Sequence, residues 1–246
     1  MMQERLYNVY ASENPQLEEA YRVLRTNIQY MGLEKKIKKL SVTSYKNGEG
    51  KTTTAINLAV SMAETGLKTL LVDADMRKSM VMKRLGSYNF TGLSNYLAGY
   101  EEIPHIISKT TVPGLDFIAC GVKPVKPVEL LESSRFHEFI EKIEKLYDMV
   151  IFDCPPLGQV IDCAVVTKHM DGALVVVRTD AVSNKKVQQV LDQFARVNAN
   201  VLGLVLNGMH RSYYKKYTSH YSDHGTARKL SRGWFAKIKK GSGHND

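Results

Sequence analysis

The sequence SYKNGEGKTTT occupies residues 44 to 54, and this stretch decides the fold. It follows an apolar run, KLSVTS at residues 39 to 44, that is typical of a buried strand, and it leads into a segment with helical periodicity at residues 52 to 64. A glycine-rich turn between a strand and a helix lets backbone N–H groups converge on phosphate oxygens. The stretch therefore predicts a phosphate-binding loop inside a strand–loop–helix unit.

Within this loop several residue types have a use in binding a triphosphate. Lys51 supplies a point charge for the β- and γ-phosphate oxygens, and Thr52 offers a hydroxyl to Mg²⁺. We expect nearly the whole loop to contact ATP: Lys46, Asn47, Gly48, Glu49, Gly50, Lys51, Thr52 and Thr53. Tyr45 stands where the general pattern has its first glycine, and a turn that merely joins strand and helix is the alternative.

Apolar, β-branched runs recur along the rest of the chain. They predict further strands at residues 68–75, 115–119, 147–153, 172–178 and 201–207. Helical periodicity marks residues 16–31, 128–146 and 184–197, and the second of these should begin just after Pro127. Because strands and helices alternate, we expect an α/β fold in which helices cover both faces of a mostly parallel sheet. The phosphate loop, which departs from the general pattern at Tyr45, places this fold with the P-loop NTPases that have a deviant Walker A loop.

The charge distribution divides the chain into a folded body and a tail. The 246 residues carry a net charge of +9, but residues 210–246 alone hold nine Lys/Arg and two Asp/Glu. Apolar periodicity also ends after the last predicted strand. We therefore expect one domain at residues 1–208, including the helix at 16–31, and a flexible, basic, tyrosine-rich tail at 209–246.

Composition also indicates the cellular compartment of the protein. The sequence has no run of about 18 apolar residues that would span a bilayer, and its first residues lack the apolar core of a signal peptide. We expect a cytosolic protein. Its cysteines, Cys120, Cys154 and Cys163, are odd in number and lack metal-site spacing, which favours reduced thiols in or near the core.

Aspartates follow two of the predicted strands, Asp73 and Asp75 in LLVDADMRK and Asp153 in MVIFDCPP. Strand ends of a parallel sheet are where ligands bind, and Mg²⁺ takes oxygen ligands. Asp153 is placed like a Walker B aspartate, and one of the Asp73/Asp75 pair could hold metal while the other accepts a proton. The alternative is that each aspartate caps a helix or begins a turn.

Together, SYKNGEGKTTT, LLVDADMRK and MVIFDCPP resemble motifs of the bacterial tyrosine kinases that regulate capsule and exopolysaccharide synthesis, and the resemblance extends over roughly residues 17–221. It implies that Lys51 and Thr52 contact nucleotide and Mg²⁺, and that Asp73 and Asp153 complete the metal site with Thr52. It also implies that Asp75 activates the tyrosine hydroxyl. Arg77 completes the Asp-x-Asp-x-Arg motif and joins Lys51, Asp73 and Asp75 in the expected catalytic set.

Three further positions bear on this resemblance. Asn207 matches a residue that in related ATPases touches adenine, so we expect it to bind ATP. Lys46 stands where partition and septum-site ATPases carry a signature lysine, and Ser79 replaces a proline common in the kinases. A positioning ATPase that binds DNA or membrane therefore stays open as the alternative function.

The predicted helix at residues 16–31 carries Glu19, Arg22 and Arg25 in the spacing E-x-x-R-x-x-R. In the family this motif implies contacts between subunits of a ring, so we expect these residues to mediate oligomerisation. Pairing of Glu and Arg within the helix is the alternative.

The tail concentrates four of the chain's 13 tyrosines within nine residues, Tyr213, Tyr214, Tyr217 and Tyr221. The family resemblance implies that they are autophosphorylated in trans, and each phosphate would offset local basic charge. Alternating aromatic and basic residues could instead stack on single-stranded nucleic acid, but we expect no nucleic-acid partner because the body is nearly neutral.

The resemblance also implies partners. It predicts a separate transmembrane adaptor that activates the kinase and recruits it to the inner face of the membrane, and protein substrates in polysaccharide assembly. Near the C-terminus, Trp234, Phe235 and Ile238 among lysines could rest on an anionic membrane, or this end could be disordered. A nucleotide-switched scaffold without catalysis is a third reading of the phosphate loop.

Overall fold

The computed structural model describes residues 6–7, 14–33, 35–81, 91–158, 160–180 and 183–209. The chain divides into two compact units, Met1–Asn207 and Gly208–Asp246, and every helix and strand named below belongs to the first. The tyrosine cluster and the segment around Trp234 lie outside the described residues. Nothing in the structure therefore bears on them.

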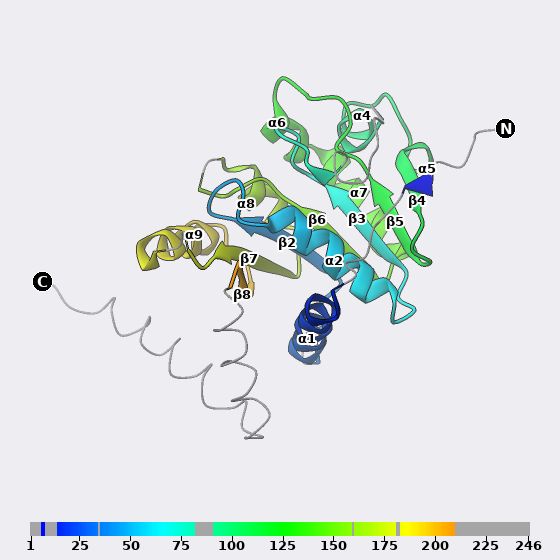
Figure 1. Ribbon diagram of the computed structural model, residues 1–246. Helices are drawn as coiled ribbons and strands as arrows, with labels where there is room; N and C mark the ends of the chain where they lie inside the picture. Colours follow the sequence, from blue (N-terminus) through cyan, green and yellow to red (C-terminus); the bar gives the residue numbers. More distant parts are fainter. Residues whose placement is uncertain are drawn as a thin grey trace, which may run out of the picture. The chain divides into compact units, whose positions relative to one another are not determined.

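In the described part of the chain, eight strands form one sheet in the order β1-β4-β5-β3-β6-β2-β7-β8 (Figure 1). Neighbouring strands are parallel except β4 and β5, which are antiparallel. The strands are β1 Leu6–Tyr7, β2 Lys39–Ser44, β3 Thr69–Asp73, β4 Ile107–Thr110, β5 Leu115–Ile118, β6 Met149–Asp153, β7 Gly172–Arg178 and β8 Val201–Asn207.

Helices cover both faces of this sheet. They are α1 Pro15–Met31, α2 Lys51–Ala63, α4 Leu93–Leu97, α5 Ile103–Ile106, α6 Pro127–Leu131, α7 Ser134–Leu146, α8 Asp162–Thr167 and α9 Asn184–Arg196. One core lies under α1 and α2, whose Ile28 and Leu58 pack with Leu71 of the sheet. The other lies under α4 and α7–α9 and contains Phe136 and Phe194.

The amphipathic pattern of α7 shows why these faces form. Phe136, Phe139, Ile140 and Ile143 recur at helical spacing and are buried, and the rings of Phe136 and Phe139 meet Phe152 of β6 edge-on. On β3 the burial alternates between the two cores, because successive side chains of a strand point to opposite faces. The central strands are consequently buried on both sides.

The predicted α/β class is confirmed, and β2, β7 and β8 have the predicted bounds. The prediction of one helix at residues 128–146 is wrong, since α6 ends at Leu131 and α7 begins at Ser134. Ser133 interrupts the helix with an extended backbone (φ −70°, ψ 157°) while its hydroxyl donates to the Leu130 carbonyl at 2.7 Å. A hydroxyl that binds nearby backbone competes with helix continuation.

All three cysteines are free thiols and buried, as predicted. Among the described residues, no helix combines the length and apolar character needed to cross a membrane.

Candidate active site

Three adjacent strands bring the predicted site residues to one edge of the sheet. β3, β6 and β2 lie side by side and end at Asp73, Asp153 and Ser44. Asp73 pairs in register with Asp153, and the Ala74 N–H donates to the Asp153 carbonyl at 2.9 Å. Segments about eighty residues apart in sequence therefore meet at the carboxyl ends of parallel strands, where ligands bind in such sheets.

The loop between β2 and α2 has a backbone that only glycine adopts readily. Gly48 and Gly50 have φ values of +85° and +98°. A Cβ on Gly50 would also lie 2.0 Å from Nδ2 of Asn207. Gly50 precedes α2 without any side-chain cap, and the partial positive charge of a helix N-terminus favours an anion at this end.

Lys51, the first residue of α2, points into a group of carboxylates. Its Nζ lies 3.1 Å from Oδ2 of Asp75 and 3.4 Å from Oδ1 of Asp153. The Thr52 hydroxyl donates to Oδ2 of Asp153 at 2.7 Å. All four residues are buried, so these interactions are screened less than a surface ion pair.

Asp73 lies beside this group within a network of its own. Its Oδ1 accepts the Asp75 N–H at 3.1 Å, and its other oxygen accepts a hydrogen bond from the Ser79 hydroxyl. Ser79 stands where a proline is common in the family. Here its hydroxyl holds the carboxylate that was predicted to help bind metal.

Burial and mutual repulsion shift these groups in a consistent direction. Burial, followed by the negative charge of Asp153, raises the pKa of Asp73 to about 8. Burial likewise raises the pKa of Asp153. Burial alone would lower the pKa of Lys51, but the charges of Asp153 and Asp75 outweigh it and raise that pKa. The site therefore holds more negative charge than its lysine neutralises, which suits a divalent cation.

Metal-free protein should lose stability as the pH rises. Asp73 has a folded pKa near 8 against an ordinary value of 3.8, so the folded state binds the extra proton between those values. The stabilisation that this proton gives the folded protein is fully present below the pKa of Asp73 in the unfolded chain. It is lost as the pH rises through the pKa of Asp73 in the folded protein. We expect the melting temperature in chelator to fall between about pH 5.5 and about pH 8.5, and Asp73→Asn to remove much of that fall. An equal slope in the variant would contradict the assignment.

The described side chains fit Mg²⁺ as part of a larger ligand set. Within the described segments, no group of three or more His, Cys, Asp or Glu side chains is arranged to hold a metal by itself. Mg²⁺ is usually bound through one or two carboxylates together with substrate phosphates and water. Thr52 and Asp153, already joined by a hydrogen bond, are the side chains that would supply the protein ligands in such an arrangement, with Asp73 next to them.

Glu49 and Asn207 link the phosphate loop to the last strand. Asn207 Nδ2 donates to the Glu49 carbonyl at 2.9 Å, and the Lys46 N–H donates to Oε2 of Glu49 at 3.0 Å. The other oxygen of this buried Glu49 carboxylate has no hydrogen-bond partner in the described structure. The structure thus brings Asn207 to the loop that contains Lys46 and Glu49. That residues 46–53 and Asn207 contact ATP stays a prediction.

Arg77 makes a contact that the sequence did not predict. Its guanidinium forms two hydrogen bonds with Asp162 at the start of α8, at 2.8 Å and 3.0 Å. Asp162 was missed because an aspartate in the first turn of a helix is favourable for the helix itself and carries no functional signal in one sequence. The two residues are 85 positions apart, and the fold alone brings them together.

The three predicted oligomerisation residues lie on α1 with different contacts. Arg22 pairs within the helix with Glu18 and Glu19, at 3.9 Å and 3.6 Å, and its side chain is 55 % exposed. Arg25 instead donates to the Ser61 carbonyl and hydroxyl of α2, at 2.6 Å and 2.9 Å. Arg25 therefore anchors α1 to its own domain, which the spacing E-x-x-R-x-x-R did not reveal.

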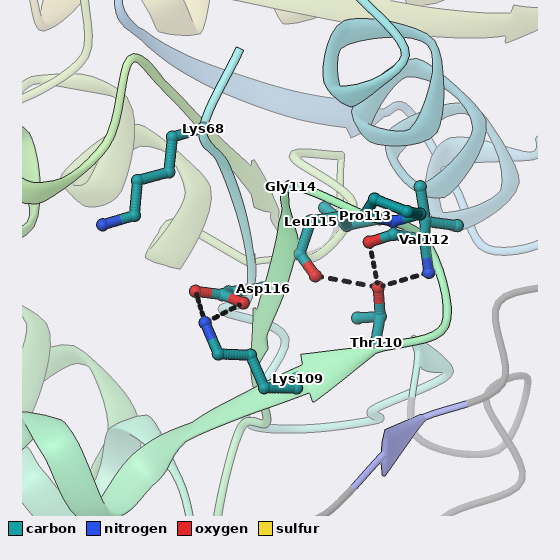
Figure 2. A pocket seen from close by; sticks show the side chains of 8 residues that line it. All are labelled: Lys68, Lys109, Thr110, Val112, Pro113, Gly114, Leu115 and Asp116. Carbon is teal, nitrogen blue, oxygen red and sulfur yellow. Dashed lines mark hydrogen bonds and ion pairs between the residues drawn. The ribbon is translucent and has the colours of Figure 1, made fainter. Parts of the chain in front are cut away.

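A separate small pocket of about 190 Å³ lies at the opposite strand ends, where β3 and β5 begin (Figure 2). Lys109 Nζ reaches both oxygens of Asp116, at 2.9 Å and 3.0 Å. The Tyr147 hydroxyl donates to the same carboxylate. These polar groups satisfy one another, and the pocket lies away from the phosphate loop.

The parallel sheet, the glycine loop and the Lys51, Thr52 and Asp153 group define a P-loop nucleoside-triphosphatase fold. A family model described as an AAA domain matches residues 37–204. Tyrosine-protein kinase CpsD of Streptococcus agalactiae is 37 % identical over 219 residues, covering 87 % of this chain and 91 % of that protein. YwqD of Bacillus subtilis strain 168, also a tyrosine-protein kinase, is 34 % identical over 85 % and 90 % of the two chains.

Solved structures agree with these relatives. The kinase domain of Escherichia coli tyrosine kinase ETK matches with a TM-score of 0.78 and 33 % identity, over 85 % of this chain and 84 % of that one. A septum site-determining protein MinD from Pyrococcus horikoshii matches with a TM-score of 0.60 at 24 % identity, over 71 % and 72 % of the two chains, which shows the shared fold alone. The chain belongs to the bacterial tyrosine-protein kinases. The family predicted from the three motifs is thereby confirmed.

Proposed function

We propose that this kinase binds Mg-ATP at the Ser44–Thr54 loop and transfers the γ-phosphoryl group to tyrosine. The observation that carries this proposal is the position of Lys51 Nζ between Asp75 and Asp153, at 3.1 Å and 3.4 Å, with Thr52 bonded to Asp153. Lys51 binds the β- and γ-phosphate oxygens, and the amides of the loop and of α2 bind the others. Asn207, held against Glu49, contacts the adenine.

Thr52 and Asp153, with support from Asp73, would hold Mg²⁺, and the bound ion would supply positive charge to neutralise the phosphates. Asp75 accepts the proton of the attacking tyrosine hydroxyl. The phenolic oxygen forms a bond to the γ-phosphorus, the bond from that phosphorus to the β–γ bridging oxygen breaks, and ADP leaves. A carboxylate can serve as this base because it already lies beside the Lys51 ammonium that meets the phosphates.

The proposed acceptors include Tyr213, Tyr214, Tyr217 and Tyr221 of a neighbouring copy. The tail from residue 210 holds nine basic and two acidic residues, so phosphate on these tyrosines changes its charge strongly. By analogy with the family, the activity regulates capsular or exopolysaccharide synthesis, further substrates belong to that assembly, and a transmembrane adaptor recruits the kinase to the inner face of the membrane.

A ring-like oligomer is the arrangement we propose for delivering the tail to a neighbour. Glu19 and Arg22 are the exposed members of the α1 motif, whereas Arg25 is bound to Ser61. We expect the Glu19→Ala/Arg22→Ala double variant to assemble less, because it removes exposed charges without detaching α1. Light scattering would show a lower mass than the wild type. An unchanged mass would show that Glu19 and Arg22 do not mediate assembly and only pair within α1.

The test of the proposed reaction is incubation of the purified protein with labelled ATP and Mg²⁺, with and without the cytosolic fragment of an adaptor. Mass spectrometry of the tail and release of inorganic phosphate are measured on the same samples. Phosphotyrosine at residues 213–221 supports the proposal. Phosphate release with an unmodified tail in the stimulated sample would favour the positioning-ATPase alternative, for which Lys46 is the sequence feature.

A further inference from the structure

The Arg77–Asp162 pair joins two segments that border the active site. Arg77 and Asp75 lie on the loop that follows Asp73, the last residue of β3, and Asp162 is the first residue of α8, after β6. Nε and one Nη of Arg77 meet the two oxygens of Asp162 at 2.8 Å and 3.0 Å. Such two-point pairs fix orientation as well as distance. The Asp162 side chain is 1 % exposed and Arg77 is 43 % exposed.

Arg77 lies within the turn that orients Asp75. The Lys78 N–H donates to Oδ1 of Asp75 at 3.0 Å, and the Asp75 N–H donates to Oδ1 of Asp73 at 3.1 Å. These bonds hold the loop to itself. The Arg77 side chain ties the same turn to α8, so a shift of Arg77 would move the Lys78 amide and with it the Asp75 carboxylate.

We propose that Asp162 is a positioning residue for phosphoryl transfer, which acts through Arg77 to fix the direction of the Asp75 carboxylate toward the tyrosine hydroxyl. This inference rests on the role proposed for Asp75 above. Asp162 suits such a role because it is buried and belongs to helix α8 rather than to the loop that carries Asp75. The phosphate loop is held separately, through Glu49 and Asn207.

Asp162→Asn tests this role by removing the charge while keeping the size of the side chain. A misplacement of about 1 Å in a reacting group can cost about 100-fold in rate, so we expect kcat for tyrosine phosphorylation to fall by about 10- to 100-fold. Affinity for ADP should stay within about twofold of the wild type, because the phosphate loop keeps its own contacts. Fluorescence titration with labelled ADP measures that affinity.

Asp116→Asn is the matched control. Asp116 is also a buried carboxylate held at two points by an exposed cation, Lys109, but it lies at the opposite strand ends (Figure 2). The same chemical change there should lower the melting temperature while leaving kcat unchanged. Comparison of the two variants separates a positioning effect from a general loss of stability.

Arg77→Lys provides a second variant should Asp162→Asn fold poorly. Lysine keeps the charge but cannot form the two-point fork, and we expect kcat to fall by at least about fivefold with ADP affinity retained. A kcat in the Asp162→Asn and Arg77→Lys variants equal to that of Asp116→Asn would overturn the inference. Parallel loss of ADP binding in a folded variant would also overturn it.

Asp75→Asn distinguishes this inference from the proposed function. If that variant is inactive while Asp162→Asn works at the wild-type rate, the positioning role alone is wrong. If Asp75→Asn keeps the wild-type rate, the base role of Asp75 fails, and the positioning role fails with it.

Discussion

Lys51→Met should abolish tyrosine phosphorylation, with an expected loss of at least about 1,000-fold. The ammonium of Lys51 lies between two buried carboxylates and is the group that would meet the phosphates. Without it, Asp75 and Asp153 face the triphosphate with like charge, and the transferred phosphoryl group loses a fixed counter-charge. Initial rates of phosphotyrosine formation measure the loss, and binding of labelled ADP shows how much of it arises before the chemical step.

Lys39→Met is the matched control for this change. Lys39 is also a largely buried lysine held by two carboxylates, Glu144 at 2.6 Å and Asp171 at 3.6 Å, but it stands where β2 begins. Its loss should lower stability and leave phosphorylation intact. A Lys51→Met protein that keeps more than about a tenth of wild-type activity would contradict the role assigned to the ammonium.

Asp75→Asn should lower the rate of tyrosine phosphorylation by about 100- to 10,000-fold, the usual contribution of a positioned general base. Asparagine keeps the size of the side chain and an oxygen for the Lys78 amide, but it cannot accept the phenolic proton. ADP affinity should change little, because Thr52 and Asp153 keep their hydrogen bond. Measurement of kcat and of ADP affinity on the same preparation separates the two effects.

A rate within about tenfold of the wild type would show that Asp75 is not the base. Asp116→Asn again serves as the control for a buried aspartate lost far from the phosphate loop. Because Asp75 contacts Lys51 directly, the Lys51 and Asp75 variants should not have additive effects, and the double variant would report that coupling.

Sequence alone predicted the central part of the fold because its signals are local. From β2 through the Ser44–Thr54 stretch to the end of α2, an apolar run, glycines and helical periodicity follow one another within about 25 residues. The break at Ser133 was missed because it lacks proline or glycine, and a serine hydroxyl ends the helix only in its folded context. The short antiparallel strand β4 has one partner in β5 and another in β1, and neither pairing leaves a periodic signal.

The residues of the candidate site also fall into those that the sequence predicted and those whose contacts it did not predict. Lys51, Thr52, Asp73, Asp75 and Asp153 were predicted because each follows a strand or occupies a recognisable motif, and the structure places them together. The contacts of Arg77 with Asp162 and of Arg25 with Ser61 join positions 85 and 36 residues apart. Side chains that far apart in sequence meet only through the tertiary fold. Reasoning from one sequence therefore assigned Arg77 and Arg25 to motifs without identifying the residues that they contact.

A mixing experiment tests the central claim most directly. One chain carries Lys51→Met with its tail intact, and the other has an intact site with Tyr213, Tyr214, Tyr217 and Tyr221 all changed to Phe. With labelled ATP, Mg²⁺ and the adaptor fragment, the account predicts phosphotyrosine at residues 213–221 of the Lys51→Met chain. A bare tail on that chain, while its partner binds and consumes ATP, would contradict transfer from this site to a neighbour's tyrosines.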